Sequence, residues 1–231
     1  MAAKSYRDAF FTDRKLSSDK YDHYFDVYDH LLAHLYGQSI AYVEIGVQNG
    51  GSLETAGKLF GNDSKIIGVD IDPRCRSLEQ MGFANKIIIG SQTDENCLRE
   101  IVQAAPSIDI LIDDGSHIQY DMIFTFINLF PFIKEGGVYI IEDTHTNYSP
   151  DHQNSFFGIG LYDYFKGLSE RLNLDFIDPE LRKNRYKIPR EERAPLPKPL
   201  DICSQIFSIE FFDSIIAIKK RRKEEPLRIR R

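Results

Sequence analysis

The strongest constraint on the fold is an alternation of short apolar runs with amphipathic stretches between residues 41 and 141. Each apolar run is rich in Ile or Val and is followed by a polar or glycine-containing turn, which is typical of buried parallel strands. The order of these segments predicts an α/β fold in which right-handed helical crossovers join parallel strands. The predicted strands are residues 41–47, 65–71, 86–90, 108–112 and 137–141, and the predicted helices are residues 52–60, 74–81, 95–104 and 120–133.

The C-terminal part of the chain departs from this alternation. Residues 202–209 and 214–219 are apolar runs separated by only four residues. Because so short a connection cannot join parallel strands, the two runs are predicted to form an antiparallel hairpin. Five parallel strands closed by a hairpin outline the Rossmann-like class I methyltransferase fold, with a seven-stranded, mostly parallel sheet and helices on both faces.

The domain boundaries follow from the same patterns. Residues 1–38 are predicted to be an N-terminal helical cap, because aromatic and Leu residues at helical spacing in residues 19–36 predict a helix along one edge of the domain. Residues 39–220 form the predicted α/β domain. Within it, residues 144–200 have weaker periodicity, a predicted helix at 161–172 and a Pro- and charge-rich stretch at 179–199. We expect this insertion to be a substrate lid, since it leaves the carboxyl edge of the sheet.

Charge and hydropathy limit the classes of partner. The chain has a net charge of −6, although residues 219–231 alone contribute +6 and include the predicted basic tail, residues 221–231. An acidic body argues against a nucleic-acid groove, which needs clustered Lys and Arg. The apolar runs are strand-sized and no export signal is evident at the N-terminus, so neither membrane spanning nor secretion is expected, and we expect a cytoplasmic protein.

A glycine-rich turn, GVQNGGS at residues 46–52, follows the first predicted strand. By itself this signal is weak, since a tight turn explains it and the spacing is neither a dinucleotide fingerprint nor a phosphate-binding loop. The second strand adds Asp70 at its carboxyl end, where a carboxylate can accept both hydroxyls of a ribose. Asp72 and Pro73 are instead predicted to begin the next helix. The third strand ends before Ser91 and Gln92, which places them beside an adenine.

Two acidic motifs follow the fourth and fifth strands, DDGSH at residues 113–117 and EDTH at residues 142–145. Adjacent strands would bring these carboxylates to one edge of the sheet, where they repel one another unless a cation or protons compensate. A hard, oxygen-preferring ion such as Mg²⁺ suits them. Helix capping is the alternative for Asp113 or Asp114 taken singly, and it explains two acidic pairs on neighbouring strands less well.

His117 is the predicted general base. It lies three residues after Asp114 on the turn that leaves the same strand, and an imidazole with a pKa near neutrality can take a proton from an acidified hydroxyl. His145 is the alternative base. A His in a loop is often only a polar surface residue, so both assignments depend on the neighbouring carboxylates.

These motifs together resemble the metal-dependent sugar O-methyltransferases. That family includes macrolide-sugar (mycinamicin-type) and rhamnosyl O-methyltransferases and relatives labelled cephalosporin hydroxylase. The resemblance extends from about residue 18, at Ser-Asp-Lys, to the hairpin at residues 212–214. Residues 144–148 and the long charged loop depart from the aromatic, glycine-rich segment of the macrolide-sugar enzymes, which leaves the acceptor open.

The resemblance implies an Mg²⁺-dependent transfer of a methyl group from S-adenosylmethionine to a hydroxyl of a sugar, glycosylated natural product or polysaccharide. It implies His117 as the base and a homo-oligomer. The geometry of a metal ion that binds the reacting hydroxyl and its neighbour predicts an acceptor with vicinal hydroxyls. The implied ligands of Mg²⁺ are Asp114, Glu142 and Asp143. The predicted cofactor-binding residues are Glu44, Gly46, Gly50, Ser52, Asp70, Ile71, Ser91, Gln92 and Asp113.

Two other functions fit parts of the pattern. A non-haem iron hydroxylase would use Asp114, His117 and His145 as two imidazoles and one carboxylate. In that case the glycine-rich turn and Asp70 would have no role. A catalytically inactive S-adenosylmethionine-binding module would keep the fold without turnover.

Overall fold

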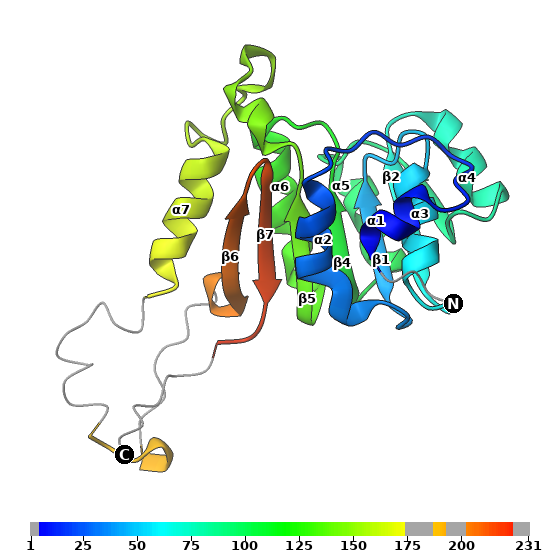
Figure 1. Cartoon of the computed structure of the whole chain (residues 1–231). Helices are drawn as coiled ribbons and strands as arrows, with labels where there is room; N and C mark the ends of the chain where they lie inside the picture. The colour runs from blue at the N-terminus through cyan, green and yellow to red at the C-terminus, as the bar shows by residue number, and fades with distance from the viewer. Residues whose placement is uncertain (1–4, 174–186, 193–201, 224–231) are drawn as a thin grey trace.

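The computed structural model describes residues 5–173, 187–192 and 202–223 of the chain. Seven strands form a single sheet in the spatial order β3-β2-β1-β4-β5-β7-β6 (Figure 1). Strands β1 to β5 are parallel, and β7 lies antiparallel between β5 and β6. The predicted class I arrangement is therefore confirmed. The strands are β1 (Ala41–Ile45), β2 (Lys65–Asp70), β3 (Lys86–Ile89), β4 (Ile108–Asp113), β5 (Ile133–Ile141), β6 (Ile206–Phe212) and β7 (Ile215–Lys220).

Helices cover both faces of the sheet and divide the hydrophobic core into two layers (Figure 1). One layer packs under α1 (Tyr6–Phe11), α2 (Tyr24–Leu32), α3 (Gly51–Leu59) and α4 (Ser77–Gln80). The other packs under α5 (Glu95–Ala104), α6 (Gln119–Leu129) and α7 (Leu161–Arg171). Among the described residues, none of the helices is long and apolar enough to cross a membrane. Short 3₁₀ segments are Ala33–Leu35, Pro73–Arg76, Phe130–Phe132, Thr144–Tyr148, Pro150–His152, Arg190–Glu192 and Ile202–Gln205.

The prediction for residues 19–36 is only partly correct. The helix α2 begins at Tyr24, five residues later than predicted, and residues 17–20 have no regular secondary structure. The helix also packs on a face of the sheet instead of along an edge, because Phe25, Tyr28 and Leu31 are all within the hydrophobic core. Tyr21 fits the helical spacing by coincidence, since its side chain is 53% exposed.

Several other boundaries differ from the predicted ones. The predicted helix at 120–133 ends at Leu129, just before Pro131, which has no amide hydrogen to donate to a helix. Strand β5 then begins at Ile133 instead of residue 137. Strand β6 begins at Ile206 and extends to Phe212, so that the hairpin turn contains only Asp213 and Ser214.

The predicted lid is described in part. Its beginning contains two short 3₁₀ segments followed by α7, which agrees with the predicted helix at 161–172. The Pro- and charge-rich stretch at 179–199 lies outside the described residues except for residues 187–192. Most of the basic tail, from residue 224 onwards, also lies outside them.

The turn after β1 is formed by a close approach between two backbones. Gly46 has φ +84°, and a Cβ atom at this position would lie 2.0 Å from the carbonyl oxygen of Asp114. The amide of Gly46 donates to the carbonyl of Val69, and the amide of Asp114 donates to that of Ile45. Glycine is therefore required where β1 and β4 deliver their loops to the same edge of the sheet.

Substitution of this glycine separates steric overlap from backbone strain. We expect Gly46→Ala to lower the free energy of unfolding by about 3 kcal/mol or more, since it adds a clash to an unfavourable φ. Gly82→Ala is the matched control, because Gly82 has φ +81° with open space around it. Its expected cost is about 1 kcal/mol. Urea denaturation of both variants measures the difference, and equal losses would contradict the role given to the Asp114 backbone.

Candidate active site

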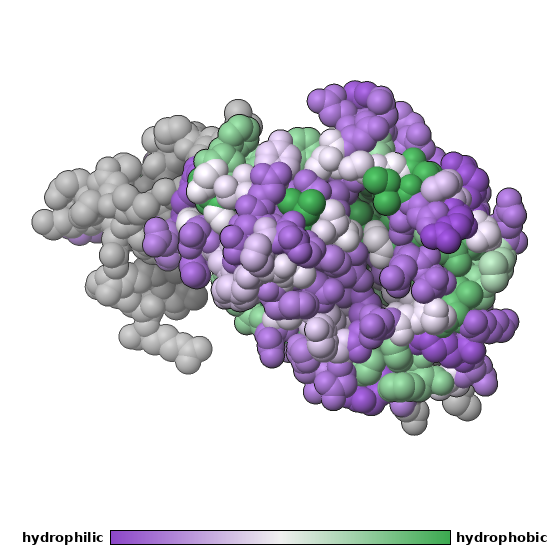
Figure 2. Space-filling view, turned by 90° about the horizontal axis from the view of Figure 1, so that it is seen from above, coloured by the Kyte–Doolittle hydropathy of each residue, from purple (hydrophilic) through white to green (hydrophobic). Residues whose placement is uncertain are grey.

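A pocket of about 570 Å³ lies at the carboxyl edge of the parallel strands. Its size is within the range of about 300–1,000 Å³ that is usual for small-molecule sites. Figure 2 looks down on this edge, where hydrophilic groups predominate on the surface. The lining residues come from the loops after β1 to β5 and from the segment before α2. The pocket therefore joins the glycine-rich turn to both acidic motifs.

Five of the predicted cofactor-binding residues line this pocket: Gly46, Asp70, Ile71, Ser91 and Gln92. The carboxylate of Asp70 is held at the end of β2 by two backbone amides, from Gln48 at 2.8 Å and from Asp72 at 2.9 Å. These bonds fix the carboxylate toward the pocket. As predicted, Asp72 caps the next helical segment by accepting the amide of Arg74.

Four predicted cofactor-binding residues are not part of the pocket lining: Glu44, Gly50, Ser52 and Asp113. Gly50 has φ +79° and lies against Leu78, while Ser52 is buried in α3. Glu44 is buried in β1 and accepts a hydrogen bond from Tyr42. A direct contact of these four residues with a ligand stays a prediction.

Asp113 is fully buried at the end of β4. Its carboxylate accepts hydrogen bonds from the amide of Gln92 and the hydroxyl of Tyr139, both at 3.0 Å. Burial raises its pKa to about 7, although these two donors oppose the increase. The side-chain oxygen of Gln92 accepts a hydrogen bond from the backbone amide of Ser116 at 2.7 Å, so this side chain connects the loops after β3 and β4.

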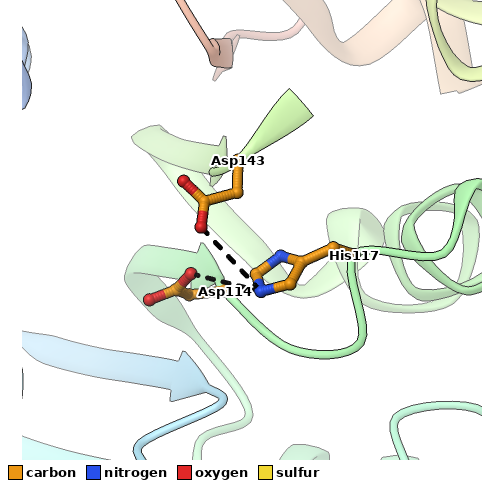
Figure 3. A group of neighbouring side chains, drawn as sticks. All are labelled: Asp114, His117 and Asp143. Atoms are coloured by element: carbon orange, nitrogen blue, oxygen red, sulfur yellow. Dashed lines mark ion pairs between the residues drawn. The ribbon is translucent and has the colours of Figure 1, made fainter. Parts of the chain in front are cut away.

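Asp114, His117 and Asp143 form the compact centre of the acidic region (Figure 3). His117 Nε2 lies 4.0 Å from Asp114 Oδ1 and 3.9 Å from Asp143 Oδ2. One potential ligand atom from each residue lies within 4.8 Å of the other two. Both His117 and Asp143 have a positive φ, 57° and 52°, a conformation that is uncommon outside glycine and often found at functional sites.

Glu142, the third predicted metal ligand, has different partners. Its carboxylate accepts hydrogen bonds from the hydroxyl of Tyr28 and from the ammonium of Lys20, the latter at 2.5 Å. Lys20 Nζ also lies 2.5 Å from Asp114 Oδ2. Asp143 is held in turn by Tyr24, whose hydroxyl donates to Oδ1 at 2.6 Å.

Burial controls the ionisation of this cluster. It raises the pKa of both Asp114 and Glu142, while Lys20 opposes both increases. Repulsion by Glu44 and Asp143 raises the pKa of Asp114 further, and repulsion by Asp114 raises that of Glu142 further. Burial also acts to lower the pKa of Lys20, but attraction by Glu142 and Asp114 outweighs it and the pKa is raised. Lys20 is therefore protonated at neutral pH.

His117 is suited to accept a proton. Burial lowers its pKa below the usual value, against the opposing effect of Asp143, so the imidazole is neutral at pH 7. Its buried Nδ1 has no hydrogen-bond partner among the described residues. His145 also lines the pocket, but its Nδ1 is 2.5 Å from the hydroxyl of Ser214 and it is not part of the compact centre.

The residues that sequence reasoning missed come from the N-terminal segment. Asp19, Lys20, Tyr21 and Tyr24 line the pocket, and Tyr28 contacts Glu142 beneath it. The aromatic residues of α2 are predicted to be core, and Tyr24 and Tyr28 are indeed buried, but their hydroxyls bind the acidic motif. Nothing in the sequence pattern distinguishes a buried Lys20 from a solvated one.

Comparison with known proteins agrees with this geometry. Residues 43–144 match the family model described as a methyltransferase domain. This segment of the chain is therefore similar in sequence to a methyltransferase domain. The matched segment begins within β1 and ends after β5, and so includes the glycine-rich turn, Asp70 and the carboxylates of both acidic motifs.

Curated proteins similar to this chain are named as O-methyltransferases. This chain is 34% identical over 140 residues to 8-demethyl-8-alpha-L-rhamnosyl tetracenomycin-C 2'-O-methyltransferase of Streptomyces olivaceus. The alignment covers 58% of this chain and 36% of that protein. Demethylmacrocin O-methyltransferase of Streptomyces fradiae is 35% identical over 130 residues, with 53% of this chain and 32% of that protein covered. The resemblance to sugar O-methyltransferases is confirmed, although the chain spans only about a third of the length of these relatives.

The fold has a solved counterpart in the MycE methyltransferase from the mycinamycin biosynthetic pathway, determined in complex with Mg and SAH. The two structures superpose with a TM-score of 0.67 and 26% sequence identity. The similarity covers 87% of this chain and 49% of that protein. This likeness confirms the predicted class I methyltransferase fold.

Gln92 offers a test of the pocket wall. We expect Gln92→Ala to lower the free energy of unfolding by about 2 kcal/mol, because it removes one of two side-chain donors to the buried Asp113 and leaves the amide of Ser116 without its acceptor. The matched control is Gln103→Ala on the exposed side of α5, with an expected change within about 0.5 kcal/mol. Chemical denaturation compares the two, and a Gln92 variant as stable as the control would argue against this bridge.

Proposed function

We propose that this chain is an Mg²⁺-dependent O-methyltransferase that transfers a methyl group from S-adenosylmethionine to a sugar hydroxyl. The observation that supports it best is a single pocket with a cofactor-type end and an acidic end. Gly46, Asp70 and Ser91 line the first end, and Asp114, His117 and Asp143 line the second. A donor and an acceptor bound at these ends would be held next to each other, which is the main requirement of methyl transfer.

The donor end suits a nucleoside. The Asp70 carboxylate at the end of β2 keeps acceptor capacity beyond its two backbone donors, so it can bind the hydroxyls of a ribose. Gly46 lines the pocket beside it, at the turn before α3. Ser91 and Gln92 lie after β3, where an adenine would follow the ribose along the edge of the sheet.

The acidic end fits a divalent ion by the chemistry of its donor atoms. One oxygen of each carboxylate already has a hydrogen-bond donor: Lys20 donates to Asp114 Oδ2, and Tyr24 donates to Asp143 Oδ1. The other oxygen of each, Asp114 Oδ1 and Asp143 Oδ2, faces His117. Carboxylate oxygens are preferred by Mg²⁺, and an imidazole is less suited to it. We therefore assign Asp114 and Asp143 as ligands, with Glu142 beside them, and keep His117 as the base.

When bound, Mg²⁺ would acidify the acceptor hydroxyl and S-adenosylmethionine would supply an activated methyl group. His117 would take the hydroxyl proton at Nε2, the ring nitrogen directed to the pocket between the two carboxylates (Figure 3). Its neutral state at pH 7 allows this without prior deprotonation. Asp114 and Asp143 would then stabilise the imidazolium that forms.

The acceptor is proposed from the relatives. Two of them are named for methylation of rhamnosyl tetracenomycin-C and demethylmacrocin, and a MycE structure is a complex with Mg, SAH and Mycinamycin VI. We propose a glycosylated natural product or polysaccharide with a free, vicinal hydroxyl as acceptor here. The described part of the predicted lid supports a role in acceptor binding, since His145 from Thr144–Tyr148 lines the pocket.

The donor site is tested by calorimetric titration of S-adenosylmethionine. We expect Asp70→Ala to weaken binding by at least about 10-fold, because charged hydrogen bonds to the ribose are lost. The matched control Asp72→Ala removes a neighbouring carboxylate that does not line the pocket, and should bind within about twofold of wild type. A chelator should stop turnover while leaving donor binding in place. The proposal would be overturned if the wild-type protein bound no S-adenosylmethionine either with Mg²⁺ or with chelator.

The base is tested by the rate of SAH formation on a panel of rhamnosyl and macrolide-sugar acceptors with Mg²⁺. We expect His117→Ala to lower the rate by about 10²–10⁴-fold with unchanged donor affinity, since only proton transfer is removed. His145→Ala should cost less than about 10-fold, because its imidazole is bonded to Ser214. The reverse order of the two variants would transfer the role of base to His145.

A further inference from the structure

Lys20 is the feature of the site that the proposed function does not explain. It lies in the irregular segment that precedes α2, far in sequence from the strands that carry the acidic motifs. Its ammonium contacts the carboxylates of Asp114 and Glu142, each at 2.5 Å. A single side chain thus connects the end of β4 with the end of β5.

These contacts are unlike a surface ion pair. The side chains of Lys20 and Glu142 are 4% and 1% exposed, and that of Asp114 is 19% exposed. Exposed ion pairs contribute little, whereas removal of one partner from a buried pair leaves an uncompensated charge and is strongly destabilising. Lys20 must therefore stay paired for the carboxylates to remain side by side.

The surroundings also hold Lys20 in place. The segment before it is fixed to α3 by Glu54, which accepts the backbone amides of Lys15 and Leu16. On the other side, Tyr28 from α2 donates to the second oxygen of Glu142. Both oxygens of Glu142 are thus satisfied by protein groups, and Asp114 keeps Oδ1 free toward His117.

We infer that Lys20 is a positioning residue, a protein-borne cation that holds Asp114 and Glu142 together before a divalent ion binds and remains beside them afterwards. The first half of the inference concerns the site before ion binding and stands by itself. The second half concerns the bound divalent ion and rests on the proposed function. The three predicted metal ligands carry three negative charges when ionised, and the ammonium of Lys20 compensates one of them. One divalent ion would neutralise the remaining two. The ion then completes an assembled site instead of creating it.

Thermal unfolding of Lys20→Met in EDTA and in saturating Mg²⁺ tests the first half. In EDTA we expect the Tm to fall by about 10 °C, because two buried carboxylates lose their cation. Mg²⁺ should recover most of this loss, and should raise the Tm of wild type by much less. Lys58→Met is the matched control. Lys58 Nζ lies 2.9 Å from the carboxylate of Glu54, and neither residue lines the pocket. The change in Tm of this variant should therefore not respond to Mg²⁺.

The double variant Lys20→Met/Glu142→Gln keeps the test independent of the metal. Removal of one negative charge together with the ammonium should restore the metal-free Tm to within about 3 °C of wild type if charge is the cause. A double variant as unstable as Lys20→Met would show that Lys20 acts only through packing, and would overturn the inference. If neither Mg²⁺ nor Mn²⁺ affects any variant while this rescue holds, the metal dependence of the proposed function fails and the ion pair stands.

Labelling of amines by acetic anhydride, read by mass spectrometry, tests whether Lys20 stays in place. We expect Lys20 to be protected with EDTA and with Mn²⁺ alike, while exposed lysines such as Lys166 react in both conditions. Labelling of Lys20 only when Mn²⁺ is bound would show that the ion displaces the ammonium. That result would overturn its role as a lasting partner of the acidic residues.

Discussion

The active site depends on carboxylates that are held closer together than their charges favour. Strands β4 and β5 are parallel neighbours, so Asp114 and Glu142 leave the sheet side by side. Water cannot screen them there, because Glu142 is buried and Asp114 is largely so. Protein groups satisfy them instead, namely the ammonium of Lys20 and the hydroxyl of Tyr28. The rest of the site is arranged around this compensation.

In that arrangement the N-terminal segment contributes to the candidate site as well as to the hydrophobic core. Helices α1 and α2 contribute aromatic side chains to the same hydrophobic layer as β1 and β4, which explains the apolar periodicity of this region. The same packing brings the hydroxyl of Tyr24 to Asp143 and places Lys20 in the lining of the pocket. A helix on the face of the sheet thereby supports side chains at its edge.

Much of the site was predictable because it consists of residues at strand ends. The positions of Asp70, Asp114 and Asp143 follow from strand order alone, since parallel strands present their carboxyl ends at one edge. Contacts that cross between sequence-distant segments were not predictable. Lys20 and Glu142 are 122 residues apart, and no local pattern marks them as partners. The late start of α2 at Tyr24 escaped prediction for a similar reason, since Tyr21 continues the apolar spacing although it is exposed.

The amino-acid sequence by itself determined the class I fold, because the alternation of apolar and amphipathic segments and the short C-terminal connection each allow few pairings of strands. It also determined which acidic and imidazole groups share the carboxyl edge. Only the tertiary structure decided which side chains contact each other: His117 faces Asp114 and Asp143, whereas Glu142 binds Lys20 and Tyr28. The physical reason is that strand order fixes which ends are neighbours, while side-chain partners depend on burial and on packing between distant parts of the chain.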